Sequence, residues 1–220
     1  MLPLGDNVPR QKAPVMTWIL LLLNVFIFIY QLCLPRREIQ YIFYQFGLIP
    51  RMLSTAPLGN SLNLLTSMFV HGSLVHLLGN MWILWLFGDN VEDRMGHIPF
   101  FFFYLLSGVV AAIFHVVYNP ASAVPTIGAS GAIAGVMAAY LFLFPLARVR
   151  TLFIIIIFPY FIDIPSFVYI GIWFLTQLYY GAISMGATAY HGVAWWAHIG
   201  GFLFGAFFYR KFLKKGRNRG

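Results

Sequence analysis

Two polar residues in otherwise apolar stretches have the types needed for nucleophilic catalysis. Ser130 lies two residues after Gly128, in the run Gly-Ala-Ser-Gly, and His198 lies in a later apolar stretch. A serine needs a base to become nucleophilic, and histidine is the usual one. Taken singly, each residue has a plainer interpretation. The Gly-Ala-Ser-Gly run could be a small-residue packing strip with Ser130 as the helix N-cap, and His198 could hydrogen-bond a neighbouring helix. The question is whether the two can meet.

Groups that could stabilise an oxyanion accompany the serine. If Ser130 lies in the first turn of a helix, free backbone N–H groups and the positive end of the helix dipole favour negative charge beside it. In an earlier apolar stretch, His76 and Asn80 lie four residues apart, on one face of a helix. Polar groups within a membrane are costly, so these positions suggest function.

The acidic residues exclude other kinds of protease. All of them lie outside the apolar stretches or at their edges: Asp6, Glu38, Asp89, Glu92, Asp93 and Asp163. No aspartate pair is available for an aspartyl intramembrane protease, and no His-Glu-x-x-His is present to bind zinc. No acid is placed to orient His198, so the chemistry would be that of a Ser–His dyad rather than a triad. We therefore expect no metal and no cofactor.

The elements that must position these residues are membrane helices. The chain is 60% hydrophobic and 9% charged, whereas soluble domains carry about 25% charged residues. Its mean hydropathy is +0.80. A single cysteine, Cys33, excludes an intrachain disulfide. The net charge of +8 could indicate nucleic acid, but the basic residues lie between or beyond the apolar stretches. We expect a lipid bilayer as the partner and no nucleic acid.

Six apolar stretches predict an all-α polytopic membrane protein with six transmembrane helices. They are residues 16–34, 63–88, 98–118, 130–147, 165–184 and 191–209. Each is close to the ~20 residues that cross about 30 Å of hydrocarbon. The run 152–162 is too short to span and contains Pro159, which favours a re-entrant or interfacial extended segment. The predicted domains are an N-terminal tail (1–14), one six-helix domain (15–209) and a basic tail (210–220).

The basic residues predict the direction of the helices. If the N-terminus is cytoplasmic, eleven of the 14 Lys and Arg residues lie on the cytoplasmic side, as the positive-inside rule requires. The exceptions are in the first external loop, which is long enough to form an interfacial structure of its own. We expect a multi-pass protein of a prokaryotic cell membrane with both termini cytoplasmic.

Depth and packing indicate that Ser130 and His198 share one site. At ~1.5 Å per residue, His198 lies about 18 Å above Arg210, and Ser130 lies about 22–27 Å above the end of its own helix. Gly-x-x-x-Gly follows both residues, as Gly131/Gly135 and Gly201/Gly205. Small residues four apart let helix backbones approach closely. The spacing predicts that the two helices pack together.

In order and on successive predicted helices, the motifs resemble the rhomboid family over residues 66–209. The matching positions are His71, His76, Asn80, Gly88, Glu92, Arg94, Gly96, Gly128, Ser130, Gly131, His198, Gly201 and Gly205. The resemblance implies an intramembrane serine endopeptidase that cleaves transmembrane helices of substrate proteins. It implies that Ser130 is the nucleophile and His198 the general base.

The resemblance also assigns supporting roles. His76, Asn80 and Gly128 would form the oxyanion site with the Ser130 N–H. Two further sets would be structural: Glu92 with Arg94, as a pair closing a cytoplasmic loop, and the glycines Gly201 and Gly205. His71 looks structural as well. In the family, the fifth helix moves to admit substrate; here it carries Trp173, Phe174 and Gln177, which we interpret as packing residues.

One position departs from the family pattern. Many rhomboids carry an aromatic residue four positions after the serine, stacked on the catalytic histidine, and here that position is Ala134. Trp195 or Trp196 could compensate. Two other functions stay open: a non-catalytic rhomboid-like protein that binds transmembrane segments, and a transporter or channel. The first should lack the serine or histidine, and the second should show duplicated spans or charged groups along a path. The sequence shows none of these features and does not indicate an oligomeric state.

Overall fold

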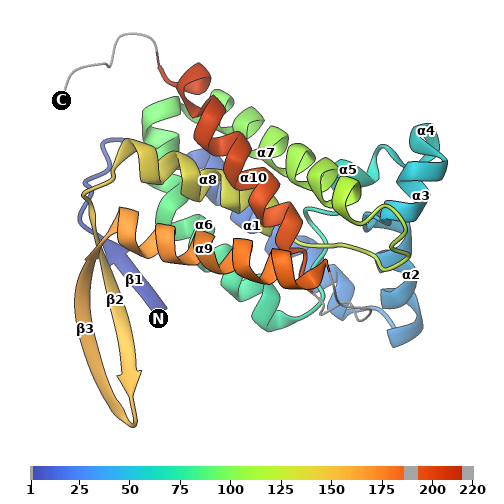
Figure 1. The fold of residues 1–220 in the computed structure, drawn as a ribbon, viewed down its shortest axis with the longest axis horizontal. Helices are drawn as coiled ribbons and strands as arrows, with labels where there is room; N and C mark the ends of the chain where they lie inside the picture. The colour runs from blue at the N-terminus through green and yellow to red at the C-terminus, as the bar shows by residue number, and fades with distance from the viewer. Residues whose placement is uncertain (1, 186–192, 215–220) are drawn as a thin grey trace.

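The structure is a computed structural model that describes residues 2–185 and 193–214. Helices run along the long axis of the molecule, and a small sheet lies at one end of them (Figure 1). The helices are α1 Val15–Leu32, α2 Arg36–Phe46, α3 Pro50–Thr55, α4 Pro57–Asn60, α5 Asn63–Thr66, α6 Leu74–Met95, α7 His97–Tyr118, α8 Ser130–Leu143, α9 Ser166–Ser184, α10 Trp195–Phe208 and the 3-10 helix η1 Tyr209–Phe212. The strands are β1 Leu2–Asp6, β2 Arg148–Ile155 and β3 Phe158–Pro165.

Three helices in the described ranges are long and apolar enough to cross a bilayer: α1, α7 and α9. A fourth span results if the segments Pro57–Phe69 and Leu74–Met95, which meet at a bend of 80°, are taken as one. The prediction of six spans is therefore not confirmed. The helix α8 has only 14 residues, and the start of the sixth predicted stretch, at 191, lies outside the described residues.

The second predicted stretch, 63–88, begins too early, because it includes the short helix α5 and the loop that precedes α6. Helix α6 begins only at Leu74, because the Ser73 hydroxyl accepts a hydrogen bond from the backbone N–H of His76 at 3.1 Å and caps the helix. It continues to Met95 and ends where Gly96 adopts a φ of 92°. Apolar composition indicates where the stretch lies, but it does not show that Ser73, inside the stretch, caps the helix.

The sheet corrects the expectation of an all-α fold. Strand β2 pairs antiparallel with β3 over their full lengths and with β1 on its other edge, in the order β1-β2-β3. The run 152–162 is thus extended, as its short length and Pro159 predict. Pairing between β1 and β2 joins residues nearly 150 positions apart, a contact that no local pattern indicates.

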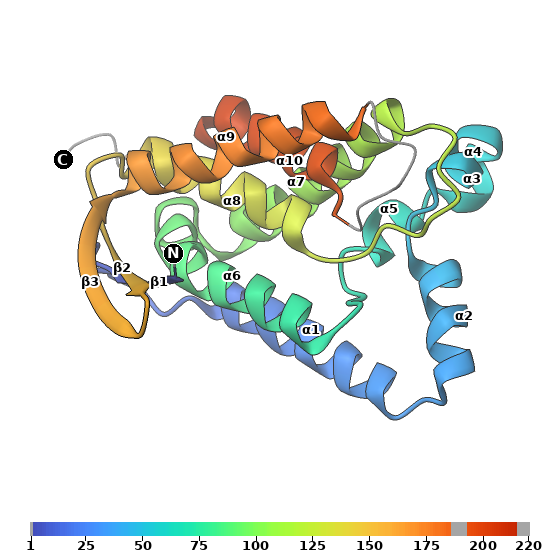
Figure 2. The same cartoon turned by 60° about the horizontal axis from the view of Figure 1, so that its bottom comes forward.

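The N-terminal segment is attached to the helices as well as to β2. The indole N–H of Trp82 donates to the carbonyl oxygen of Pro3 at 2.6 Å. The carboxylate of Asp6 accepts from the Tyr140 hydroxyl at 2.9 Å and from the Asn90 amide at 3.0 Å. Burial raises the pKa of Asp6. At the far end of the molecule, α2, α3 and α4 form the small structure that the length of the first loop suggests (Figure 2).

Helix α8 lies at the centre of the helices. Ten successive residues, Gly131–Tyr140, are buried, and α6, α7, α9 and α10 pack around them. A Cβ atom on Gly201 would overlap the carbonyl oxygen of Gly131, and one on Gly205 would overlap the backbone of Gly135. Because neither position has room for a side chain, the glycines bring the backbones of α10 and α8 into direct contact. This confirms the predicted packing.

Candidate active site

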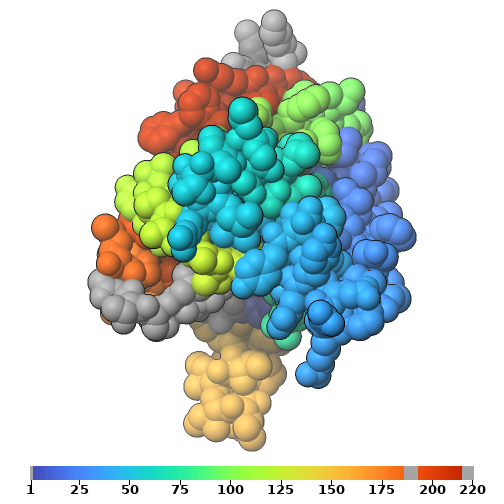
Figure 3. Space-filling view, turned by 90° about the vertical axis from the view of Figure 1, so that its right-hand side faces the viewer, coloured from blue at the N-terminus to red at the C-terminus, as the bar shows by residue number. Residues whose placement is uncertain are grey.

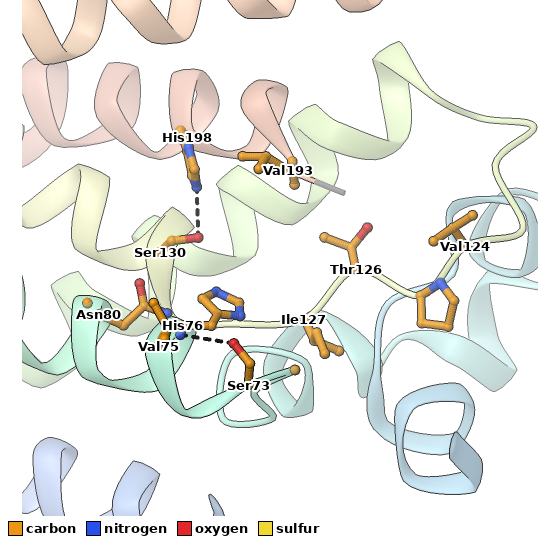
Figure 4. A pocket seen from close by; sticks show the side chains of 14 residues that line it. Ser73, Val75, His76, Asn80, Val124, Thr126, Ile127, Ser130, Val193 and His198 are labelled. Atoms are coloured by element: carbon orange, nitrogen blue, oxygen red, sulfur yellow. Dashed lines mark hydrogen bonds between the residues drawn. The ribbon is translucent and has the colours of Figure 1, made fainter. Parts of the chain in front are cut away.

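The contact between α8 and α10 brings Ser130 and His198 together. Ser130 is the first residue of α8, and His198 is in the first turn of α10. The His198 Nε2 lies 2.8 Å from the Ser130 Oγ, a hydrogen-bond distance (Figure 4). A histidine nitrogen at this distance can accept the serine proton as the oxygen attacks a carbonyl.

The second nitrogen of His198 has a partner that the sequence does not reveal. The His198 Nδ1 lies 2.8 Å from the Oε1 of Gln177, on α9. The amide nitrogen of Gln177 is directed elsewhere: it donates to the carbonyl oxygen of Trp173 at 3.1 Å and to the Thr176 hydroxyl at 3.1 Å. The oxygen therefore faces His198 and accepts the proton of Nδ1, which leaves Nε2 as the acceptor facing Ser130.

Gln177 was expected to be a packing residue, and its hydrogen bond corrects that interpretation. It is buried in the structure. The available signal was its type: it is the one amide side chain in the stretch 165–184, and a large polar group in an apolar span needs a partner. The partner itself depends on how α9 is rotated, which the sequence does not specify.

Aromatic rings approach His198 from two helices. The Trp173 ring on α9 lies 5.9 Å from the imidazole, centroid to centroid, and the Trp195 ring on α10 lies edge-on at 6.2 Å. Trp196 instead stacks on Tyr118 at 3.7 Å. Of the two tryptophans considered as replacements for an aromatic at Ala134, it is Trp195 that reaches the histidine.

His76 and Asn80 lie below Ser130 (Figure 4), and Gly128 lies against both of their side chains. Gly128 has a φ of 115°, and a Cβ atom there would lie 2.6 Å from the Nε2 of His76 and 3.5 Å from the Asn80 amide nitrogen. Only glycine fits this backbone and this space. The Asn80 amide nitrogen also lies 3.0 Å from the Nε2 of the buried His71. This contact supports the structural interpretation of His71, because it fixes the direction of the Asn80 side chain.

A cavity of about 650 Å³ opens beside these residues. Its wall comes from the start of α6, the segment before α8 and the start of α10: Gly72, Ser73, Val75, His76, Gly79, Asn80, Val124, Pro125, Thr126, Ile127, Ser130, Val193, Ala194 and His198. Both members of the Ser130–His198 pair and two of the predicted oxyanion groups thus face one space. That space is large enough for a peptide segment and water.

The sequence model of the Rhomboid domain matches residues 59–215. The chain belongs to the rhomboid family. It is 28% identical over 155 residues to the yeast Saccharomyces cerevisiae protein "Rhomboid protein 1, mitochondrial", a match covering 68% of this chain and 41% of the relative. It is 36% identical over 93 residues to the human "Presenilin-associated rhomboid-like protein, mitochondrial", covering 41% of this chain and 24% of the relative. The match to "RHOMBOID-like protein 6, mitochondrial" of Arabidopsis thaliana is 36% over 78 residues, covering 36% of this chain and 25% of the relative.

These rhomboid relatives overturn the expected location. We expected a prokaryotic cell membrane with both termini cytoplasmic, whereas the matching relatives are mitochondrial proteins of eukaryotes. Basic residues distinguish one side of a membrane from the other but do not identify the membrane, so the error lay in naming the compartment. The matched segments cover less than half the length of each of these relatives.

Within the rhomboid domain, Glu92 and Arg94 do not pair with each other in the described contacts. The Glu92 carboxylate accepts hydrogen bonds from the backbone N–H groups of Met16 and Thr17, at 2.8 and 2.7 Å, and from the Thr17 hydroxyl at 2.6 Å. It therefore ties the first turn of α1 to the end of α6. Arg94 lies over the ring of Phe144 at 5.5 Å. Both contacts support the structural interpretation, with different partners from the one expected.

Proposed function

We propose that this chain is an intramembrane serine endopeptidase that cleaves transmembrane helices of substrate proteins. The observation that carries the proposal is the 2.8 Å contact between the His198 Nε2 and the Ser130 Oγ, with Gln177 bound to the other nitrogen of the same imidazole. That arrangement gives Ser130 a neutral base whose acceptor nitrogen points at it. Membership of the rhomboid family supports the reaction class.

In the proposed reaction, the Ser130 oxygen attacks the carbonyl carbon of the scissile peptide bond. His198 takes the serine proton at Nε2 and then delivers it to the nitrogen of the leaving amine, which breaks the C–N bond. The product is an ester of Ser130. A water molecule in the cavity then attacks the ester, with His198 again as base, and releases the carboxylic acid and the free serine.

Negative charge on the carbonyl oxygen needs hydrogen-bond donors while the tetrahedral intermediate lasts. We place them at the Ser130 backbone N–H and at the side chains of His76 and Asn80, because these three residues line one cavity. Gly128 has no side chain that would fill this space. The helix dipole of α8, whose N-terminus is at Ser130, favours the same charge.

The proposal includes the membrane arrangement. We propose that α1, α6, α7, α8, α9 and α10 all cross the bilayer, within one domain of residues 15–209 between a short N-terminal segment and a basic tail. Helix α8 can be short because its buried residues contact other helices rather than lipid. Residues 215–220 of the tail lie outside the described residues. The substrates of the protein would be membrane proteins, and the protein itself would lie in the lipid bilayer.

The test is cleavage by purified protein of a panel of single-span membrane proteins, with product ends located by mass spectrometry. We expect cut sites within or at the edge of the substrate's transmembrane helix, and none with Ser130→Ala. Binding of a substrate without cleavage by the folded wild-type protein would instead support the non-catalytic function. Equal cleavage by Ser130→Ala would contradict the proposed nucleophile.

A further inference from the structure

The outer part of the β2–β3 hairpin, residues 152–162, is apolar on both faces and largely exposed. Every residue from Leu152 to Ile162 is uncharged, and the side chains of Ile154, Ile156 and Ile157 are 69%, 89% and 75% exposed. Successive residues of a strand point to opposite faces, so a hairpin with one face toward a core would alternate apolar and polar residues. This one does not alternate, which indicates apolar surroundings on both sides.

The turn at its tip carries residues that turns normally avoid. Ile156 and Ile157 connect the two strands, and Ile156 has a φ of 60°. Two-residue hairpin turns usually contain Asn or Gly at such positions, and a β-branched residue with positive φ is a rare outlier. The chain thus places two largely exposed isoleucines in this turn despite a conformational cost. In water, no contact would offset that cost.

The direction of the hairpin places it along a membrane surface. It runs across the helix axes, at the end of the molecule where α9 begins (Figures 1 and 2), and extends beyond the outline of the helices when these are seen end-on (Figure 3). If α1, α7 and α9 span the bilayer, as their length and composition allow, its surface lies across their axes. Arg148 and Arg150, both exposed, stand at the base of the hairpin.

We propose that the β2–β3 hairpin is a lipid anchor, with its tip, residues 153–162, inserted in the interfacial region of the leaflet at this end of the helices. Phe158, Tyr160 and Phe161 would lie at headgroup depth, where aromatic side chains are favoured. Arg148 and Arg150 would contact lipid phosphates. Helix α9, which begins directly after β3, also carries exposed apolar side chains, among them Phe167, Ile172 and Leu175.

The backbone limits how deep the tip can go. Beyond Leu152, strand β2 has no partner on the β1 side, and the outer edge of β3 is unpaired within the described sheet. Unpaired N–H and C=O groups are costly in hydrocarbon, where water cannot reach them. Pro159 removes one N–H but not the rest. The hairpin is therefore expected among headgroups and the first acyl carbons rather than at the bilayer centre.

The experiment measures where the tip lies in vesicles of phosphatidylcholine with a minority of phosphatidylglycerol. In a Cys33→Ser background, single nitroxide labels are placed at Ile154→Cys, Ile156→Cys and Phe158→Cys, and at Lys12→Cys as an exposed control on the N-terminal segment. Electron paramagnetic resonance compares collisions with oxygen, which concentrates in lipid, and with a water-soluble nickel chelate. We expect the ratio of oxygen collisions to nickel-chelate collisions to be well above the Lys12→Cys ratio at all three tip positions, and the nickel chelate to dominate at Lys12→Cys.

Two results would overturn the anchor. The first is access of the nickel chelate to the tip labels equal to that at Lys12→Cys, which would place the tip in water. The second is spin–spin broadening between tip labels that disappears when labelled protein is diluted with unlabelled protein, which would show that a second copy covers the hairpin. Three separate label positions keep the test decisive if one variant fails to fold, and no readout depends on proteolysis.

Discussion

Helices α8 and α9 both contribute to the site, but they are held in different ways. Ten successive residues of α8 are buried, and its glycines touch the backbone of α10. Of the 19 residues of α9, only Ser166, Tyr169, Ile170, Gln177 and Gly181 are buried. A Cβ atom on Gly171 of α9 would meet nothing within 4 Å, whereas one on Gly201 of α10 would overlap the chain of α8.

The reacting atoms and the group that orients them therefore lie on helices that are packed to different extents. Ser130 and His198 are on the closely packed pair, whose spacing is set by backbone contact. Gln177, which holds the imidazole, is on the helix with the smaller buried surface. We therefore expect substitution of the reacting residues to remove activity, substitution of a glycine at the α8–α10 contact to lower stability, and substitution of Gln177 on α9 to weaken activity by a smaller factor.

The largest effect should come from the dyad. Ser130→Ala removes the nucleophile and His198→Ala removes the base, so each is expected to lower kcat by roughly 10⁴ or more, as for other serine proteases. Both side chains are small or partly exposed to the cavity, so thermal unfolding should change little. The measurement is steady-state cleavage of a single-span substrate. A double variant no slower than either single one would show that the two residues act as a unit.

The next largest effect should come from the oxyanion groups. Loss of one hydrogen-bond donor to the developing oxyanion costs on the order of 2.7–4 kcal/mol, or about 10²–10³ in kcat, and leaves KM largely unchanged. Asn80→Ala and His76→Ala should show this with an unchanged melting temperature. Asn24→Ala is the matched control, because Asn24 is a buried amide of α1 that donates to the Leu20 carbonyl oxygen. Normal turnover in Asn80→Ala, or inactivity explained wholly by unfolding, would assign Asn80 a structural role.

A smaller effect is expected for the positioning residue. Gln177→Met keeps the length of the side chain but removes the acceptor for the His198 Nδ1–H. Loss of the hydrogen bond that orients a metal-ligating histidine costs about 10–100-fold, and we expect a similar loss of activity here. Gln177→Glu restores an acceptor oxygen, although it loses the donor to Trp173, so it should recover part of the rate. Recovery by Glu separates positioning from packing. Equal activity of Gln177→Met and wild type would show that α9 does not support the base.

The smallest effects compare two glycines directly. Gly201→Ala forces a methyl group against the Gly131 carbonyl, and overpacking of this kind typically costs about 1–3 kcal/mol in the free energy of unfolding. Gly171→Ala is the matched substitution on α9, where the same methyl group meets open space, and it should be neutral or stabilise slightly. Thermal unfolding in detergent measures both. Equal stability of the two variants would remove the distinction between the helices.

Much of the site could be predicted because its geometry follows from sequence-local rules. Two Gly-x-x-x-Gly runs, each just after a reactive residue, indicate which faces of the two helices meet. Ser130 and His198 lie next to these glycines in the sequence, so the same contact brings them together. Gln177 could not be assigned because α9 has no such strip, and its rotation depends on contacts with several other elements. The β1–β2 pairing was missed for a related reason: it joins distant segments, whereas the extended character of 152–162 is local and was predicted.

The boundaries of α6 show the same limit on a smaller scale. The sequence is predominantly apolar from residue 63 onward, yet helix α6 begins only after its Ser73 cap. The segment Pro57–Phe69 meets this helix at a bend of 80°. The number of spans stays a prediction for this reason. The expected compartment was corrected by the mitochondrial relatives, because the charges of the chain do not identify the membrane.

The most direct test of the account is labelling of the folded protein in lipid with a fluorophosphonate, located by mass spectrometry. The 2.8 Å contact predicts an activated serine, so the peptide containing Ser130 should carry the label in the wild type and not in His198→Ala. Gln177→Met should label more slowly than the wild type. A folded wild-type protein that does not react at Ser130, or reacts there as fast without His198, would contradict the dyad.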